Sequence, residues 1–87
     1  MSRLQMTPQT LLQPVGDEAV LLNVATGQYY ELNSVGLRMV QLLQQHDQAA
    51  TVAQLLLEFD VAPETLTADV DELIADLKQH GLAIEAV

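Results

Sequence analysis

The first third of the chain carries short apolar runs separated by turn-forming residues, a spacing that predicts antiparallel strands. The expected strands are residues 10–13, 18–24 and 28–32. Residues 25–27, Ala-Thr-Gly, are a turn that joins the last two strands in a hairpin. Residues 1–9 have no sustained period, so we expect them to form a loose N-terminal arm.

Successive side chains of a strand point to opposite faces, which assigns an inner and an outer face to this hairpin. Tyr29 and Glu31 are then expected to point away from the core. The expected inward residues are Val20, Leu22 and Val24 on the first strand, and Tyr30 and Leu32 on the returning one.

Apolar residues at helical spacing follow the hairpin. Asn33 or Ser34 can accept a hydrogen bond from the first free amides of a helix, so a first helix is expected to begin there. It is expected to end at residues 46–48. A second helix is expected from Thr51, because Thr51 and Gln54 fit a capping box.

A third helix is expected from Thr65 or Thr67 to His80, with Gly81 in the position after the helix that favours a positive φ. Residues 82–84 then predict a short return segment or small strand. The apolar stripe of this helix is Leu66, Val70, Leu73, Ile74 and Leu77.

Three strands followed by three helices predict an α+β fold, and the last two helices resemble a helix-turn-helix pair beside a sheet. The expected fold is winged-helix-like, with a small antiparallel three-stranded sheet followed by three helices. Residues 10–87 are expected to form a single domain. A chain of 87 residues has room for one small core, and aromatic residues are only 3% of it, so Leu, Val and Ala must supply the packing.

Charge argues against the usual DNA-binding function of such a fold. Twelve acidic residues stand against Arg3, Arg38 and Lys78, for a formal net charge of −9, which disfavours phosphate backbones and anionic membranes. No apolar run approaches the roughly 18–20 residues that span a bilayer, and the first residues lack a signal-peptide hydrophobic segment. We expect a cytoplasmic chain without nucleic-acid or membrane partners. The acids of the third helix are Glu64, Asp69, Asp71, Glu72 and Asp76.

No group of residues in the sequence predicts catalysis or metal binding. The absence of cysteine removes disulfides, thiolate ligands and a cysteine nucleophile. His46 and His80 lack partners at a helical spacing that would make a metal pair. Ser2 and Ser34 lie outside any nucleophile turn or phosphate loop. We therefore expect no enzyme activity, no metal and no cofactor.

Ser34 suggests one alternative from a different class. Asn33-Ser34-Val35 resembles the Asp-Ser-Leu attachment motif of acyl and peptidyl carrier proteins, which are also small and acidic. Carrier domains place a helix before that serine, whereas residues 18–32 predict a hairpin.

The strand at residues 28–32 is expected to be an edge of the sheet. It contains no Lys or Pro that would prevent another strand from pairing with it. An extended peptide that adds there would gain main-chain hydrogen bonds worth about 0.5–1.5 kcal/mol each. Alternatively, the N-terminal arm or the same strand of a second copy covers the edge, which leaves a homodimer open.

Several segments together resemble one known family. They are residues 20–33 (Val-Leu-Leu-Asn-Val-Ala-Thr-Gly-Gln-Tyr-Tyr-Glu-Leu-Asn), Gly36, Met39-Val40, Asp69-Val70, Leu73, Leu77 and His80-Gly81-Leu82. This pattern resembles the PqqD-like family, the precursor-peptide recognition elements of ribosomal natural-product (RiPP) pathways. The Thr-Gly-x-Tyr-Tyr-x-Leu-Asn segment is most similar to the stand-alone members that serve lasso-peptide clusters.

The resemblance implies a non-catalytic, winged-helix-like domain that binds the leader of a precursor peptide as an added strand on its third strand. It also implies partners: a separate leader peptidase and, in the lasso branch, a macrocyclising enzyme. Within the same family, the alternative is a chaperone that presents a precursor to a radical SAM enzyme. The strand residues carried over are Gln28, Tyr29, Tyr30, Glu31 and Leu32.

The resemblance also implies that the leader lies in a groove between the third strand and the third helix. Residues 69–77 of that helix form the wall that faces the strand. At about 100° per residue, Leu66, Leu73 and Leu77 lie together on that helix. We expect Leu73 to line the groove and acids on its rim to favour Lys or Arg in the leader. The alternative is that these acids are ordinary solvated surface. The expected rim acids are Asp69, Glu72 and Asp76.

Overall fold

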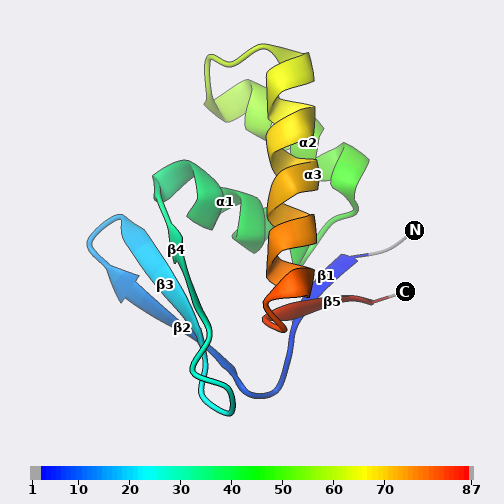
Figure 1. Ribbon diagram of the computed structural model, residues 1–87. Helices are drawn as coiled ribbons and strands as arrows, with labels where there is room; N and C mark the ends of the chain where they lie inside the picture. The colour runs from blue at the N-terminus through cyan, green and yellow to red at the C-terminus, as the bar shows by residue number, and fades with distance from the viewer. Residues whose placement is uncertain (1–2, 87) are drawn as a thin grey trace.

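The computed structural model describes residues 3–86 and contains a three-stranded sheet, a two-stranded ribbon and three helices (Figure 1). The expected α+β class and winged-helix-like fold are confirmed. In chain order the elements are β1 (Arg3–Met6), β2 (Thr10–Val15), β3 (Glu18–Asn23), β4 (Tyr29–Leu32), α1 (Ser34–Leu43), α2 (Gln48–Glu58), α3 (Pro63–Gln79) and β5 (Ala83–Ala86).

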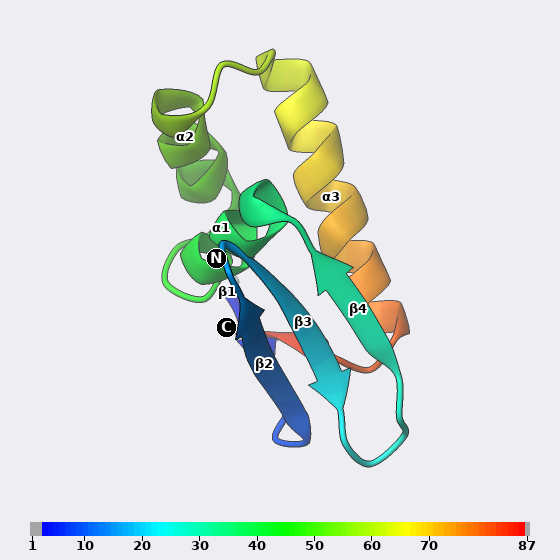
Figure 2. The same ribbon diagram turned by 90° about the vertical axis from the view of Figure 1, so that its left-hand side faces the viewer.

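The larger sheet is an antiparallel meander in the order β2-β3-β4, so β2 and β4 are its edges. The helices all lie on one side of this sheet (Figures 1 and 2). α1 contacts both β3 and β4 and therefore covers the inner face of the sheet. The other face points away from the helices and is turned toward the viewer in Figure 2.

The expected loose arm is wrong for residues 3–6, which form β1. This strand pairs antiparallel with β5, so that Arg3 lies opposite Ala86 and Met6 lies opposite Ala83. Leu4 is buried in the core. Local sequence patterns do not predict this strand, because its partner comes from the other end of the chain. Residues 1 and 2 lie outside the described residues.

The burial of β3 is the reverse of the expected one. Leu22 and Val24 are exposed, and Val20 is only half-buried. Both faces of β3 carry apolar side chains, so alternation alone could not choose between them. The inward positions of Tyr30 and Leu32 on β4 are confirmed. The inward residues of β3 are Ala19, Leu21 and Asn23.

Asn23 explains why a polar side chain occupies this inner face. Its side-chain amide donates a hydrogen bond to the carbonyl of Gly81 (3.0 Å), which ties the hairpin to the segment after α3. Its side-chain oxygen accepts hydrogen bonds from the backbone N–H groups of Ala25 and Thr26. Asn23 therefore organises the turn between β3 and β4 and holds the inner face of β3 in register.

The first two helices begin at side-chain caps. The Asn33 cap is confirmed, because its side-chain oxygen accepts a hydrogen bond from the N–H of Gly36 (2.8 Å). The expected cap at Thr51 is wrong: Asp47 caps α2 by accepting from the N–H of Ala50 (2.8 Å). An Asp in this position satisfies free amides one turn earlier, and Thr51 becomes a buried residue within the helix.

α3 begins earlier than expected, because Pro63 occupies its first turn. Proline suits that position, since its missing N–H would have no partner within the helix. Gly81 follows the helix with φ of +69°, as its expected role requires. None of the helices in residues 3–86 combines the length and the apolar character needed to cross a membrane.

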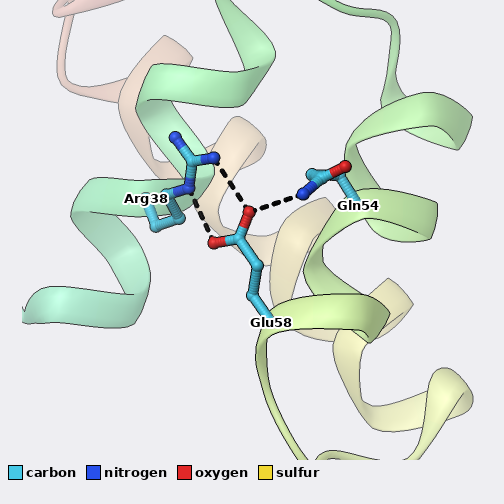
Figure 3. Close-up of polar contacts among 3 residues, drawn as sticks. All are labelled: Arg38, Gln54 and Glu58. Atoms are coloured by element: carbon cyan, nitrogen blue, oxygen red, sulfur yellow. Dashed lines mark hydrogen bonds and ion pairs between the residues drawn. The ribbon is translucent and has the colours of Figure 1, made fainter.

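An ion pair joins α1 to α2 on the outside of the molecule (Figure 3). The guanidinium of Arg38 donates to both carboxylate oxygens of Glu58, at 2.8 Å each, and the Gln54 amide also donates to Glu58. The hydrogen bonds from Arg38 and then from Gln54 lower the pKa of Glu58 to about 2. The pair links α2 to α1, which supplies part of the site described next.

Candidate functional site

A groove of about 400 Å³ lies between β4, the start of α1 and α3. Its floor is apolar and its rim carries two carboxylates of α3. A side chain entering from solvent would therefore meet apolar surface with negative charge beside it. The floor includes Leu32, Val35, Met39, Val61 and Leu73, and the carboxylates belong to Asp69 and Glu72. Glu31 also borders the groove, but the alternation of β4 directs its side chain to the outer face of the sheet, as it does that of Tyr29.

One end of this groove is closed by a contact between β4 and α3. The hydroxyl of Tyr30 donates to a carboxylate oxygen of Asp76 (3.1 Å), and its ring meets the His80 ring edge-on with centroids 5.8 Å apart. Burial raises the pKa of Tyr30, and the hydrogen bond and negative charge of Asp76 raise it further. Tyr30 is therefore a neutral donor that holds strand and helix at a fixed separation.

The backbone of β4 is available for pairing at Tyr29 and Glu31. The hydrogen bond from the N–H of Asn23 to the carbonyl of Gln28 (2.8 Å) sets the phase of the β3–β4 ladder. Bonded and non-bonded pairs alternate along antiparallel strands, so the N–H and C=O groups of Tyr29 and Glu31 point outward. No strand of residues 3–86 pairs with this edge. Four backbone groups are thus free to receive an added strand.

The other edge, β2, is a poorer place for a strand to add. The hydrogen bond from Val24 to Gln9 sets its phase, so Thr10, Leu12 and Pro14 direct their backbone groups outward. Pro14 has no N–H, and the N–H of Thr10 is already bonded to a loop carbonyl. Within the described chain, this edge offers a single N–H, that of Leu12. β4 is therefore the edge suited to strand addition.

The structure brings together most of the residues selected from the sequence. Asp76 lies at the closed end against Tyr30. Gln28 lies beyond that end, in a separate hollow beside Gln79 and His80. The expected residues that line the groove itself are Tyr30, Glu31, Leu32, Asp69, Glu72 and Leu73.

Three other expected residues are also absent from the groove lining. Leu66 and Leu77 are 1% and 0% exposed, so they hold α3 to the core and have no surface to offer a peptide. The side chain of Tyr29 lies on the outer face of the sheet, opposite Leu22. Only the backbone of Tyr29 faces the β4 edge.

Sequence reasoning missed the contribution of α1 to the groove. Val35 and Met39 are four residues apart, a spacing that indicates the apolar face of a helix and gives no sign that they also border a cavity. Gly36 lies between them, and a Cβ there would approach the Asn33 side-chain oxygen to 3.3 Å. The signal that could have found them is the helical spacing of Val35 and Met39 directly after the expected edge strand.

Two solved structures of similar fold contain bound peptides. One is described as "Lasso peptide synthetase B1 complexed with the leader peptide", with a TM-score of 0.85 and 26% identity over 94% of this chain and 98% of that chain. The other is "TbiB1 in Complex with the TbiA(beta) Leader Peptide", with a TM-score of 0.81 and 26% identity over 91% and 93%. A search of curated proteins gave no significant match.

A family profile described as "Coenzyme PQQ synthesis protein D (PqqD)" matches residues 18–83. The matched segment begins at β3 and extends into β5, so it includes β4, α1 and α3, which together form the groove. The resemblance stated from the sequence is thereby confirmed. This chain belongs to the PqqD family.

Proposed function

We propose that this protein binds the leader of a precursor peptide in the biosynthesis of a ribosomal peptide natural product of the lasso type. The observation that carries the proposal is the free edge of β4 beside an apolar groove with an acidic rim. The two similar proteins of known structure, each in complex with a leader peptide, support it.

The leader would add to the sheet as a strand on β4. Pairing with the backbone groups of Tyr29 and Glu31 would form up to four hydrogen bonds, each worth about 0.5–1.5 kcal/mol net. Alternate side chains of the leader would then point into the groove, toward Met39 and Leu73. The backbone bonds supply affinity for any extended peptide, and the groove supplies selectivity.

The rim carboxylates set the preferred composition of the leader. Asp69 and Glu72 border the groove, and the chain carries a net charge of −9. A leader with an apolar residue facing the groove and Lys or Arg nearby would be attracted before contact and retained after it. An acidic leader would be repelled.

The protein would act as a presenter of the precursor and leave the chemistry to other proteins. We propose as partners a separate leader peptidase and a macrocyclising enzyme, all in the cytoplasm. A second candidate is presentation of a precursor to a radical SAM enzyme, and it is kept because the family profile is described by coenzyme PQQ synthesis. Genes beside the one for this chain distinguish the two: a transglutaminase-like peptidase with an asparagine-synthetase-like enzyme, or a radical SAM enzyme.

The alternative of a carrier protein modified on Ser34 has less support. Ser34 is the first residue of α1, and the element before it is the strand β4, where a carrier domain has a helix. A mass gain of one phosphopantetheine on Ser34, after incubation with a phosphopantetheinyl transferase and coenzyme A, would revive it.

A titration of isotope-labelled protein tests the proposed function. The peptide is the leader segment of the precursor encoded beside this chain, and the control is a scrambled peptide of the same composition. We expect the largest amide shifts at residues 28–32 and along residues 69–76, with Tyr29 and Glu31 the most affected. Shifts concentrated in α2 would contradict strand addition on β4.

A further inference from the structure

The solvent-facing side of α2 is apolar and uncharged. At about 100° per residue, the exposed side chains of this helix gather on the side opposite the buried Thr51 and Leu55. Glu58, the single charged residue of α2, is turned toward α1, where it binds Arg38. We name this solvent-facing side the α2 face; its residues are Ala49, Ala50, Ala53, Leu56 and Leu57.

The α2 face is unusual for the outer side of a surface helix, which is normally polar. Leu57 is 82% exposed and Leu56 is 37% exposed. The chain has twelve acidic residues, and none of them lies on the α2 face. Figures 1 and 2 place α2 at one end of the molecule, beyond the three-stranded sheet. Contiguous apolar surface of this kind indicates a contact with another protein surface.

The side chains of the α2 face are small at its N-terminal end and large at its C-terminal end. A second copy of the helix, packed antiparallel with Ala53 at the two-fold axis, would place Leu57 opposite Ala49 and Leu56 opposite Ala50. Each leucine would then fill the space beside an alanine of the other copy. A surface that supplies both halves of its own match is what an isologous two-fold interface requires.

Charges flank the α2 face in a pattern that favours the same arrangement. Arg3 and His46 border one hollow at the N-terminal end of α2, where Asp47 is occupied as the helix cap. Asp60 and Glu64 are exposed beyond the C-terminal end. In an antiparallel pair, the acidic end of each copy would lie beside the basic end of the other. The positive N-terminal end of the partner helix would attract these carboxylates further.

We propose that the α2 face binds the α2 face of a second copy, in an antiparallel pair of helices with Ala53 at the two-fold axis. The helix is about 16 Å long at 1.5 Å per residue, so the contact is smaller than the roughly 1,200–2,000 Å² of stable complexes. The dimer is therefore reversible and forms at high protein concentration. Within residues 3–86 the groove lining includes no residue of α2, so the inference is independent of leader binding.

Sedimentation equilibrium over a range of concentrations up to about one millimolar tests the dimer. We expect the average mass of the wild type to rise with concentration, and Leu57→Lys to weaken association at least tenfold. Leu11→Lys is the matched control, because Leu11 is 56% exposed on β2, and it should change association less than twofold. Amide shifts on dilution of labelled protein should fall at residues 46–60.

Three results of this experiment would overturn the inference. A wild type that remains monomeric throughout would leave the α2 face to a different protein. Dissociation by Leu11→Lys with no effect of Leu57→Lys would assign the contact to the sheet. Dilution shifts confined to residues 29–32 would assign it to the β4 edge.

Exchanged charges test the antiparallel arrangement. Asp60→Lys would bring a cation to Arg3 and His46 of the other copy, whereas His46→Glu would bring an anion to Asp60. Each variant alone should weaken association about fivefold, and a mixture of the two variants should associate as well as the wild type. Thermal unfolding of each variant verifies the fold.

Asp60→Lys separates this local attraction from the general repulsion between two acidic chains. It lowers the negative charge of the protein, so general repulsion alone predicts tighter association for this variant. Tighter association of Asp60→Lys, or a mixture no stronger than the single variants, would contradict the antiparallel pair.

Discussion

At the scale of single residues, Tyr29 and Tyr30 show how two identical neighbours in a strand acquire different tasks. The ring of Tyr30 points inward and its hydroxyl holds Asp76 of α3, whereas the ring of Tyr29 lies on the outer face. The backbone roles are also opposite, because Tyr30 bonds to β3 and Tyr29 offers its groups to a guest. Substitution of either residue should therefore affect different properties of the protein.

Tyr30→Phe should lower the free energy of unfolding by about 0.5–1.5 kcal/mol, because it removes one hydrogen bond and leaves the ring in place. Such a loss corresponds to a fall in Tm of several degrees for a domain of this size, roughly 4–8 °C per kcal/mol. Thermal unfolding followed by circular dichroism measures it. Tyr29→Phe is the control and should leave the Tm unchanged; equal effects of the two variants would contradict the assigned hydrogen bond.

Glu58 gives the protein a defined acid sensitivity. Its pKa is lowered to about 2 in the folded state from an ordinary value of 4.5, mainly by Arg38. A lowered folded-state pKa contributes stability above pH 4.5, and this contribution is lost as the pH falls toward 2. The contribution is small because the pair is exposed to solvent.

We therefore expect the stability difference between the wild type and Glu58→Gln to be largest above pH 4.5 and to shrink between pH 4.5 and 2. Urea unfolding across this range measures it. Arg38→Gln removes the cause of the lowered pKa, so it should abolish the same pH-dependent part. A difference that is independent of pH would show that the ion pair is not formed in solution.

At the scale of elements, the two edge strands of the sheet differ in what they offer a guest. β4 presents the free backbone N–H and C=O groups of Tyr29 and Glu31. On β2, Pro14 has no N–H, and the N–H of Thr10 is already bonded to a carbonyl in the loop before the strand. The β4 edge also borders the groove, whereas the β2 edge does not. One sheet thus has a single edge suited to binding an extended peptide.

Glu31→Pro should weaken leader binding tenfold or more, since it removes an outward N–H and places a ring in the path of the guest. The β3–β4 ladder should survive, because that N–H is not one of its donors. Leu12→Pro is the matched control: it removes the outward N–H of β2 and should leave leader affinity unchanged. Isothermal titration of both variants, with circular dichroism to verify folding, makes the comparison; wild-type affinity in a folded Glu31→Pro protein would rule out strand addition.

Local signals account for the parts of the fold that the sequence predicted. Asn33 begins α1 and Gly81 follows α3 because a cap and a positive φ are decided by a few neighbouring atoms. The buried face of β3 depended instead on distant partners, since Asn23 is held by Gly81. The α2 start at Asp47 was missed because Thr51 offered an equally good local pattern.

The site was predictable to a similar extent. Leu32 and Leu73 lie in the groove as expected, because alternation on β4 and helical spacing on α3 are regular. Leu66 and Leu77 were assigned to the groove wrongly, since the same spacing cannot tell a core-facing leucine from one at a cavity margin. Val35 and Met39 were missed because the cavity exists only where three elements meet.

At the scale of the whole molecule, the two ends of the described chain hold each other. β1 and β5 form their own ribbon, and Leu4 and Ala83 from these strands are buried in the same core as α1 and α3. The first strand therefore belongs to the folded body, although it lies before the segment that matches the family profile.

Leu4→Ala should lower the free energy of unfolding by about 2–5 kcal/mol, the usual range for a buried leucine truncated to alanine. Gln5→Ala is the control, because Gln5 is exposed on the same strand and its substitution should change stability little. Urea denaturation of both variants measures the difference. If Leu4→Ala matched the wild type, β1 would not be part of the core in solution.

The β1–β5 ribbon has a consequence for protein engineering. Arg3 lies directly opposite Ala86, and the free edge of β4 belongs to the other sheet. A short linker could join these two positions into a continuous hairpin, and new termini could be opened at the turn between β2 and β3. Such a circular permutant should keep the groove intact while carrying a fluorescent reporter beside β2, at the edge of the sheet away from β4.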